Sequence, residues 1–380
     1  MARTIERIPL ASPSPGTARH LVVHRFGAKG ARPRVWLQAA LHADELPGPL
    51  VLHHLMPMLA EADRDGRIPG EIMVAPLANP VGLSQVVGSV LQGRYALDGA
   101  GNFNRSFVDL RESLEEAMAG KLGADAAANT AAIRDAIETL LAEQHADDES
   151  TVLKLTLHRL AATADIALDL HCDDQAALHV YCGPRQVDAF ADLAARLGAA
   201  ALLTAEDSGD TPFDEALTRP WWRLIERYPD RPIPADTMLS CTVELRGHGD
   251  IDDDTARRDA GAIFDWLQAR GAIAGEAPPA PVPTCRATPL DGVGPVRAPH
   301  AGLWVPCVEP GATVTVGQVV GHLIDPMLPA DTGRLALKAP VVGTLFARMR
   351  PGLAKPGDRV AKIASPDSIP QRRGKLLGDR

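Results

Sequence analysis

The segment Arg34–Glu45, RVWLQAALHADE, decides how the chain is interpreted, because an apolar run passes directly into a short polar stretch. Residues 34–40 form a short apolar run, which predicts a buried strand. His42 and Glu45 follow, three positions apart, so one tight turn can direct both side chains at the same ion. Imidazole and carboxylate groups are usual zinc ligands, and a catalytic zinc site combines three protein ligands with one open position. This segment therefore predicts two ligands of a zinc site.

A third ligand is expected from a second apolar run that ends in a polar group. Residues 166–170, IALDL, predict a strand, and His171 follows directly. Functional groups in open α/β sheets gather at the carboxyl ends of strands, so the fold can bring His171 to the first two ligands. A lone histidine in such a place is more often a structural group, but the combined pattern favours metal binding. Cys172 points to the opposite face of a strand, which argues against a thiol nucleophile.

Two arginines and an amide lie in a glycine-punctuated stretch without helical or strand periodicity. Asn104 and Arg105 occur in the sequence GNFNRSF, and Arg94 occurs upstream in LQGRYALDG. A guanidinium fork with a neighbouring amide suits a carboxylate, and a second cation is available to a developing oxyanion. Isolated arginines are usually solvated surface groups, whereas loops of this kind often bind ligands. The three residues are therefore candidates for substrate binding and oxyanion stabilisation.

A carboxylate interrupts a further apolar run at Leu239–Leu245, LSCTVEL, shortly before Gly247. Glu244 is either a salt-bridged residue of the core or a catalytic base. The expected zinc site favours the second interpretation, because a positioned carboxylate can remove a proton from water.

Strands alternate with helical patterns over most of the chain, which predicts an α/β fold around a mainly parallel sheet. The expected helices are residues 46–60, 114–142 and 187–200. Residues 71–76 and 178–182 predict further strands.

The C-terminal part has a different character. Residues 274–283, AGEAPPAPVP, predict a linker, and the sequence beyond them favours an all-β structure. Residues 298–317 and 339–357 form a quasi-repeat with the same order of Ala-Pro, Gly, Pro-Gly and Gly. Two such copies resemble the barrel-sandwich fold of biotinyl and lipoyl carrier domains. The hairpin before residue 339 has no modifiable lysine at a tight turn, so a lid or an assembly module is favoured over a carrier, and a homo-oligomer is one expected outcome.

Composition excludes several classes of protein. The chain of 380 residues has 39 Lys and Arg and 48 Asp and Glu, which gives a net charge of −9 and argues against a nucleic-acid-binding protein. Five widely spaced cysteines, without a CxxC pair, argue against a disulfide scaffold and for a reducing compartment. No secretory signal or membrane-spanning run is apparent, so a cytoplasmic protein without membrane or nucleic-acid partners is expected.

Taken together, HADE, FNR, DLH and VELRG resemble the succinylglutamate desuccinylase and aspartoacylase family of the zinc carboxypeptidase superfamily. The resemblance covers residues 19–274 and extends to the C-terminal β part, since family members carry a C-terminal β domain. It implies a zinc-carboxypeptidase-like mixed sheet flanked by helices. We therefore expect a zinc-dependent catalytic domain at residues 1–274 and an all-β, barrel-sandwich-like domain at residues 284–370. The metal motif departs from the commoner HGxE, because Ala43 replaces glycine.

The resemblance also implies roles for the candidate residues. His42, Glu45 and His171 match the ligands of one zinc ion per chain, and Glu244 matches the general base. Asn104 and Arg105 match the pair that binds the substrate carboxylate, and Arg94 is similar to the arginine that stabilises the oxyanion.

The implied activity is hydrolysis of the amide bond of a small N-acyl amino acid. The AGNFNR loop is also similar to that of the deacetylases of ectoine breakdown, which points to an N-acetylated diamino acid. Two alternatives remain, namely a zinc carboxypeptidase acting on short peptides and a non-catalytic binding protein.

Overall fold

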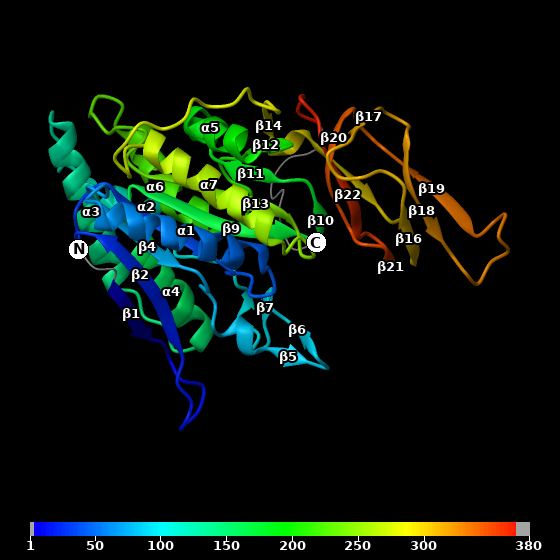
Figure 1. Cartoon of the computed structure of the whole chain (residues 1–380), viewed down its shortest axis with the longest axis horizontal. Coiled ribbons are helices and arrows are strands. Elements are labelled where there is room, and N and C mark those ends of the chain that lie inside the picture. The colour runs from blue at the N-terminus through cyan, green and yellow to red at the C-terminus, as the bar shows by residue number, and fades with distance from the viewer. Residues whose placement is uncertain (1–3, 370–380) are drawn as a thin grey trace. The chain divides into compact units, whose positions relative to one another are not determined.

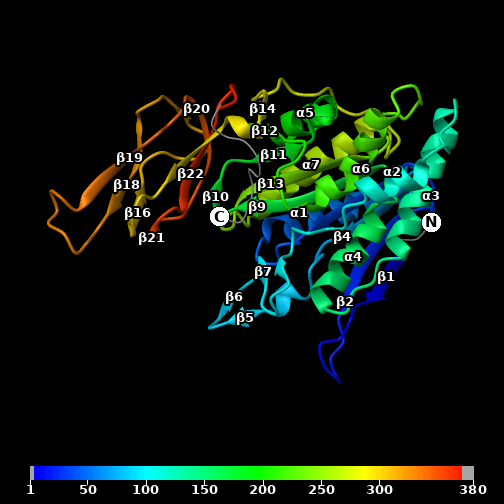
Figure 2. The same ribbon diagram turned by 180° about the vertical axis from the view of Figure 1, so that it is seen from behind.

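The structure is a computed structural model that describes residues 4–369 and has a mixed α/β fold. A large mixed sheet is flanked by helices, and further β-sheets follow in the C-terminal part, as the sequence predicts (Figure 1; Figure 2). The chain forms two compact units. Unit 1 comprises Met1–His171, Asp210–Thr242 and Ile251–Pro279, and unit 2 comprises Cys172–Gly209, Val243–Asp250 and Ala280–Arg380. The expected linker contains neither helix nor strand, but residues 172–209 and 243–250 group with the C-terminal part.

The sheet of unit 1 is mixed because its first strands run antiparallel and its central strands run parallel. In spatial order its strands are β1 (Thr4–Pro9), β2 (His20–Gly27), β4 (Glu71–Ala75), β3 (Arg34–Ala39), β9 (Ile166–Asp173) and the first residues of β13 (Leu239–Gly247). β3 pairs in parallel with β4 on one side and with β9 on the other. The expectation that His171 lies just past the end of its strand is wrong, since β9 continues to Asp173. The side chain of His171 therefore has the fixed direction of a strand residue.

Helices cover both faces of this sheet. On one face α1 (Pro47–Arg64) packs against α7 (Asp253–Ala269) and against β3. The other face buries a large apolar core beneath α2 (Arg111–Met118), α3 (Ala126–Ala142), α4 (Glu149–Ala161) and α6 (Phe213–Arg227).

The single helix expected over residues 114–142 is divided in two, which corrects that prediction. The first helix ends because Ala119 leaves the helical region with a ψ of 120°, and Gly120, with a φ of +71°, completes the tight turn that follows. Asp125 then caps the second helix, because its side chain accepts a hydrogen bond from the backbone N–H of Ala128.

Short elements connect the main ones. Unit 1 contains a 3₁₀ turn and two small hairpins, namely η1 (Gly82–Ser84), β5 (Val86–Val87) with β6 (Val90–Leu91), and β7 (Tyr95–Ala96) with β8 (Gly101–Asn102). Two of the substrate-binding candidates, Asn104 and Arg105, lie in the loop directly after the second hairpin.

Unit 2 combines a small parallel group of strands with two antiparallel sheets. The parallel group has β11 (His179–Cys182), β12 (Ala201–Thr204) and β14 (Ala287–Pro289), with α5 (Val187–Leu197) and the turns η2 (Pro184–Gln186) and η3 (Leu290–Gly292). The first antiparallel sheet has β10 (Gln175–Ala176), β20 (Gly343–Arg348), β22 (Arg359–Ala364) and β15 (Val293–Arg297), with β17 (Thr313–Val314) beside β20. The second has β19 (Arg334–Lys338), β18 (Val319–Ile324), β16 (Gly302–Pro306) and β21 (Gly352–Ala354).

The edge strand β10 ties the segment after β9 to the C-terminal sheet. Arg348 Nε donates to Gln175 Oε1 at 2.9 Å, and Arg350 Nε lies 2.8 Å from Asp174 Oδ1. Lys362 forms an ion pair with Asp173. Each of the consecutive residues 173, 174 and 175 is therefore bound by a basic side chain of the C-terminal β structure.

Candidate metal centre

A sharp turn after β3 positions the first two candidate ligands. Ala40 adopts a φ of +56°, which is unusual for a residue other than glycine and redirects the chain at the end of the strand. Asn79 Nδ2 donates to the carbonyl oxygen of Leu41 at 2.8 Å, and the N–H of Glu45 donates to the carbonyl oxygen of His42 at 3.1 Å. The tight turn that the sequence predicts is therefore present, and its backbone is fixed from both sides.

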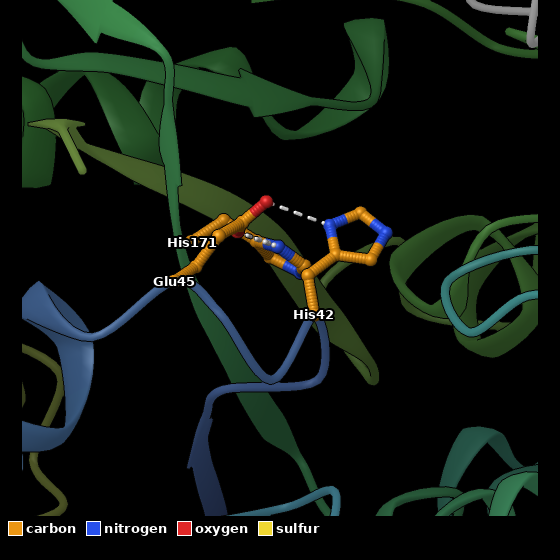
Figure 3. Close-up of side chains that lie close together, drawn as sticks. All are labelled: His42, Glu45 and His171. Carbon is orange, nitrogen blue, oxygen red and sulfur yellow. Dashed lines mark hydrogen bonds and ion pairs between the residues drawn. The ribbon is translucent and has the colours of Figure 1, made fainter. Parts of the chain in front are cut away.

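The structure brings the three predicted ligands together (Figure 3). Glu45 Oε1 lies 2.8 Å from His42 Nδ1, and Glu45 Oε2 lies 2.7 Å from His171 Nδ1. One ligand atom from each residue lies within 4.8 Å of the others, and all three side chains are buried. Two nitrogens and a carboxylate therefore converge from a loop and a strand on one small volume.

The outer nitrogen of each imidazole has an acceptor of its own. His42 Nε2 lies 2.8 Å from Asn102 Oδ1, and His171 Nε2 lies 2.9 Å from Asp169 Oδ2. Asn102 Oδ1 also accepts the backbone N–H of Asn104 at 2.8 Å, which identifies this atom as the amide oxygen. Both imidazoles must therefore carry a hydrogen on Nε2, which leaves Nδ1 as the metal-binding atom in the neutral ring.

Electrostatics links the protonation states of the three groups. Burial lowers the pKa of His171, but the carboxylates of Asp169 and Glu45 outweigh burial and hold that pKa well above its usual value. Burial would raise the pKa of Glu45, yet the two imidazoles hold it well below the usual range. Burial and the Arg94 guanidinium lower the pKa of His42. The buried Glu45 carboxylate is thus balanced mainly by positive charge on His171, because the pKa of His42 is lowered.

The chemistry of these residues fits a divalent cation. In the neutral rings the Nδ1 lone pairs face carboxylate oxygens, an arrangement that is favourable only when a proton or a cation lies between them. Metal binding requires neutral histidines and an ionised carboxylate, so a cation would take the place of the proton. Two nitrogens and one oxygen also form the protein ligand set of a catalytic zinc site.

Arg94 lies at the edge of this cluster. Its Nη1 is 3.4 Å from Glu45 Oε1 and 3.4 Å from His42 Nδ1, and its side chain is 45% exposed. The neighbouring Gly93 permits this approach, because a Cβ there would lie 2.0 Å from the backbone nitrogen of Asp44. The structure therefore places Arg94 beside the predicted ligands, and its part in oxyanion stabilisation stays a prediction.

Asn104 and Arg105 lie in the buried loop that follows β8. Asn104 Oδ1 accepts the backbone N–H of Phe213 at 2.9 Å, and Asn104 Nδ2 lies 3.3 Å from His171 Nε2. Arg105 Nη1 donates to the carbonyl oxygen of Asn104 at 2.6 Å, while Lys154 Nζ donates to the carbonyl oxygen of Arg105 at 3.2 Å. The loop is thus anchored to α4 and α6. Recognition of a substrate carboxylate by this pair stays a prediction.

Glu244 lies in β13, in the portion that belongs to unit 2, and is partly buried. The three clustered ligands belong to unit 1. Its role as a general base therefore stays a prediction.

Sequence reasoning missed the residues that support the candidate ligands and the loop beside them. Asp169 has a visible signal in the DLH motif, because residues two apart on a strand share one face. Asn102 belongs to the GNFNR motif, but nothing in the sequence connects it with a histidine 60 positions earlier. Lys154 has no signal at all, since its partner is a backbone carbonyl.

Among the described residues, no helix combines the length and the hydropathy that a membrane crossing requires.

The chain belongs to the succinylglutamate desuccinylase/aspartoacylase family of hydrolases, because residues 31–270 match the model of the succinylglutamate desuccinylase/aspartoacylase catalytic domain. No curated protein sequence matched the chain.

Solved structures agree with this assignment. A family protein from Shewanella amazonensis is 26% identical, with a TM-score of 0.84 over 96% of this chain and 99% of that one. A succinylglutamate desuccinylase/aspartoacylase homologue from Shewanella frigidimarina is 25% identical, with a TM-score of 0.85 over 96% and 97%. The ectoine utilization protein EutE from Ruegeria pomeroyi is 18% identical, with a TM-score of 0.67 over 95% and 94%, and shares the fold.

Proposed function

We propose that this protein is a zinc-dependent hydrolase that cleaves the amide bond of a small N-acyl amino acid, with one zinc per chain. The observation that carries the proposal is the buried cluster of His42, Glu45 and His171, in which two Nδ1 atoms and a carboxylate converge. Zinc held by these residues would activate water and polarise the substrate carbonyl as a Lewis acid.

The other candidate residues supply the remaining steps. Glu244 accepts a proton from the attacking water and later delivers it to the leaving amine. Arg94, which lies beside the cluster, stabilises the negative charge that develops on the attacked carbonyl oxygen. Arg105, with Asn104, binds the α-carboxylate of the substrate and so fixes the amide for attack.

The substrate class follows from the expected carboxylate pair, because a guanidinium fork matches the geometry of a carboxylate bidentately. The similarity of the AGNFNR loop to that of the ectoine deacetylases makes an N-acetylated diamino acid our leading specific candidate. A cytoplasmic location and self-association remain sequence-based predictions.

The test uses the zinc-loaded full chain and a panel of N-acyl amino acids, their carboxamide analogues and short unblocked peptides. We expect release of free amine from the N-acyl amino acids, much slower release from the carboxamides, and none from the metal-free protein. Faster cleavage of the peptides would support the carboxypeptidase alternative. Turnover that persists at the full rate in His42→Ala would overturn the proposal.

A further inference from the structure

Gln38 is a fully buried amide on β3, and its two polar atoms have different surroundings. Trp36 Nε1 donates to Gln38 Oε1 at 2.8 Å, from two residues earlier on the same strand. An indole N–H is a donor only, so a flipped amide would place two donors against each other. The position of the amide nitrogen is therefore fixed by chemistry. Within residues 4–369, that nitrogen has no hydrogen-bond partner.

Asp169, on the neighbouring strand β9, has a buried carboxylate oxygen that lacks a hydrogen-bond donor in the part of the chain that the structure describes. Gln38 and Asp169 are paired in the parallel register of β3 and β9, so their side chains leave the sheet on the same face. Asp169 Oδ2 holds His171 Nε2 at 2.9 Å, while Asp169 Oδ1 is buried without a partner among the described residues. Of these two cross-strand neighbours, Gln38 thus has a buried donor without a partner and Asp169 has a buried acceptor without a partner within the described chain.

We propose that Gln38 is a positioning residue for the metal centre. Its amide nitrogen donates to Asp169 Oδ1 through one bridging water and so keeps Asp169 Oδ2 on the imidazole of His171. The inference rests on the proposed metal-binding function. Groups that orient a metal ligand from outside set its tautomer and basicity, and their loss typically weakens metal binding about 10-fold to 100-fold.

The effect of a Gln38 substitution on metal affinity distinguishes this positioning role from simple packing. An apolar residue at this position removes the unused donor but also leaves the buried Trp36 N–H without its acceptor, so Gln38→Met is expected to cost stability whether or not Gln38 orients Asp169. If Gln38 only fills space and accepts from Trp36, metal affinity does not change. If Gln38 orients Asp169, metal affinity falls while the fold is retained.

The first experiment measures the zinc dissociation constant of the full chain by competition with a chelator. Gln38→Met is expected to weaken binding about tenfold, and Gln38→Glu, which keeps an acceptor for Trp36, is expected to weaken it at least as much. Leu37→Met is the matched control, because it alters the same strand on the opposite face. Thermal melting verifies that each variant is folded. If Gln38→Met does not fold, Gln38→Glu provides the test.

The second experiment asks whether Gln38 acts through Asp169. Asp169→Leu should weaken zinc binding by itself, and Gln38→Met should add nothing in that background, since no side-chain acceptor remains at position 169. In the metal-free protein, at a pH above the raised pKa of His171 where the ring is neutral, ¹⁵N NMR of that ring should report the Nε2–H tautomer in the wild type and a mixture of tautomers in Gln38→Met.

Two results would overturn the inference. One is a folded Gln38 variant with wild-type zinc affinity and an unchanged His171 tautomer, and the other is full additivity in the double mutant. A wrong assignment of the zinc site would be recognised separately, because His42→Ala would then bind zinc as tightly as the wild type.

Discussion

Asp169 Oδ2 lies 2.9 Å from Nε2 of His171, two residues further along the same strand. The regular alternation of β9 brings both side chains to one face, so the strand supplies a candidate ligand and the carboxylate that is hydrogen-bonded to it. This bond fixes the hydrogen on the outer ring nitrogen and directs the inner nitrogen, Nδ1, at Glu45. The strand conformation itself therefore determines which nitrogen can bind a metal.

Removal of a ligand should remove the metal. We expect about one zinc per chain in the wild type and loss of most of it in His42→Ala or His171→Ala, because three ligands are the minimum for a catalytic site. His53→Ala, a change in α1 outside the cluster, should retain zinc. Elemental analysis measures the metal content, and full occupancy in both ligand variants would contradict the assignment.

Glu244→Gln should retain zinc and substrate binding but lower kcat by roughly 10²-fold to 10⁴-fold, which is the usual contribution of a general acid–base group. The amide keeps the size of the side chain and removes its ability to accept a proton. Steady-state kinetics and a zinc determination on the same sample test this. A nearly normal kcat would mean that Glu244 is a structural residue.

Arg105→Lys should lower kcat/KM because a lysine cannot reproduce the planar fork of a guanidinium. Loss of a charge-assisted hydrogen bond that leaves a partner unsatisfied costs about 1.5–3 kcal/mol, which corresponds to roughly 10-fold to 150-fold. The variant should lose less activity on a carboxamide substrate, which has no carboxylate to bind. Equal losses on both substrates would show that Arg105 supports the loop and does not recognise the carboxylate.

Acid should destabilise the protein through His158, a residue of α4 that burial holds neutral with a pKa of about 4. Between its ordinary pKa of about 6.5 and that value, the unfolded chain binds a proton that the folded chain does not bind, so stability falls as the pH falls. The full effect of this residue is on the order of 3 kcal/mol at pH 4, from about 1.4 kcal/mol per pKa unit.

His158→Phe keeps an aromatic ring against Phe107, whose ring centroid lies 6.0 Å away, and should flatten the pH dependence of the free energy of unfolding. His145→Gln, at an exposed position, is the control. Denaturant titrations at pH 7 and pH 4.5 measure the difference. An unchanged slope in His158→Phe would show that His158 is protonated in the folded state.

A chain that ends at residue 280 should be poorly soluble. It loses β20 and β22, so β10 has no neighbour and the Asp173 carboxylate loses Lys362. It also exposes His179, whose ring packs 4.8 Å from that of Phe346. Soluble yield and thermal melting of the truncated and full chains test this. A truncated chain that melts at the full-length temperature would show that the C-terminal β structure adds no stability.

Several elements follow from local patterns. The apolar runs at residues 34–40, 71–76 and 239–245 correspond to β3, β4 and β13, because a buried strand needs only a continuous apolar segment. Helix α1 begins at Pro47, where a proline fits the first turn. The long helix over residues 114–142 is wrongly predicted because the many alanines of this segment favour a helix throughout, whereas a tight turn at Ala119 and Gly120 follows α2.

The sequence alone predicted the candidate ligand set, since a histidine and a glutamate three apart and a histidine after a second apolar run are local facts. The tertiary structure decided what surrounds those ligands. Asn102 and Asp169 meet the histidines, and Gln38 comes beside Asp169, only when β3, β8 and β9 have folded together. Hydrogen bonds act over about 3 Å, so partners that are far apart in the chain become recognisable only after folding has brought them together.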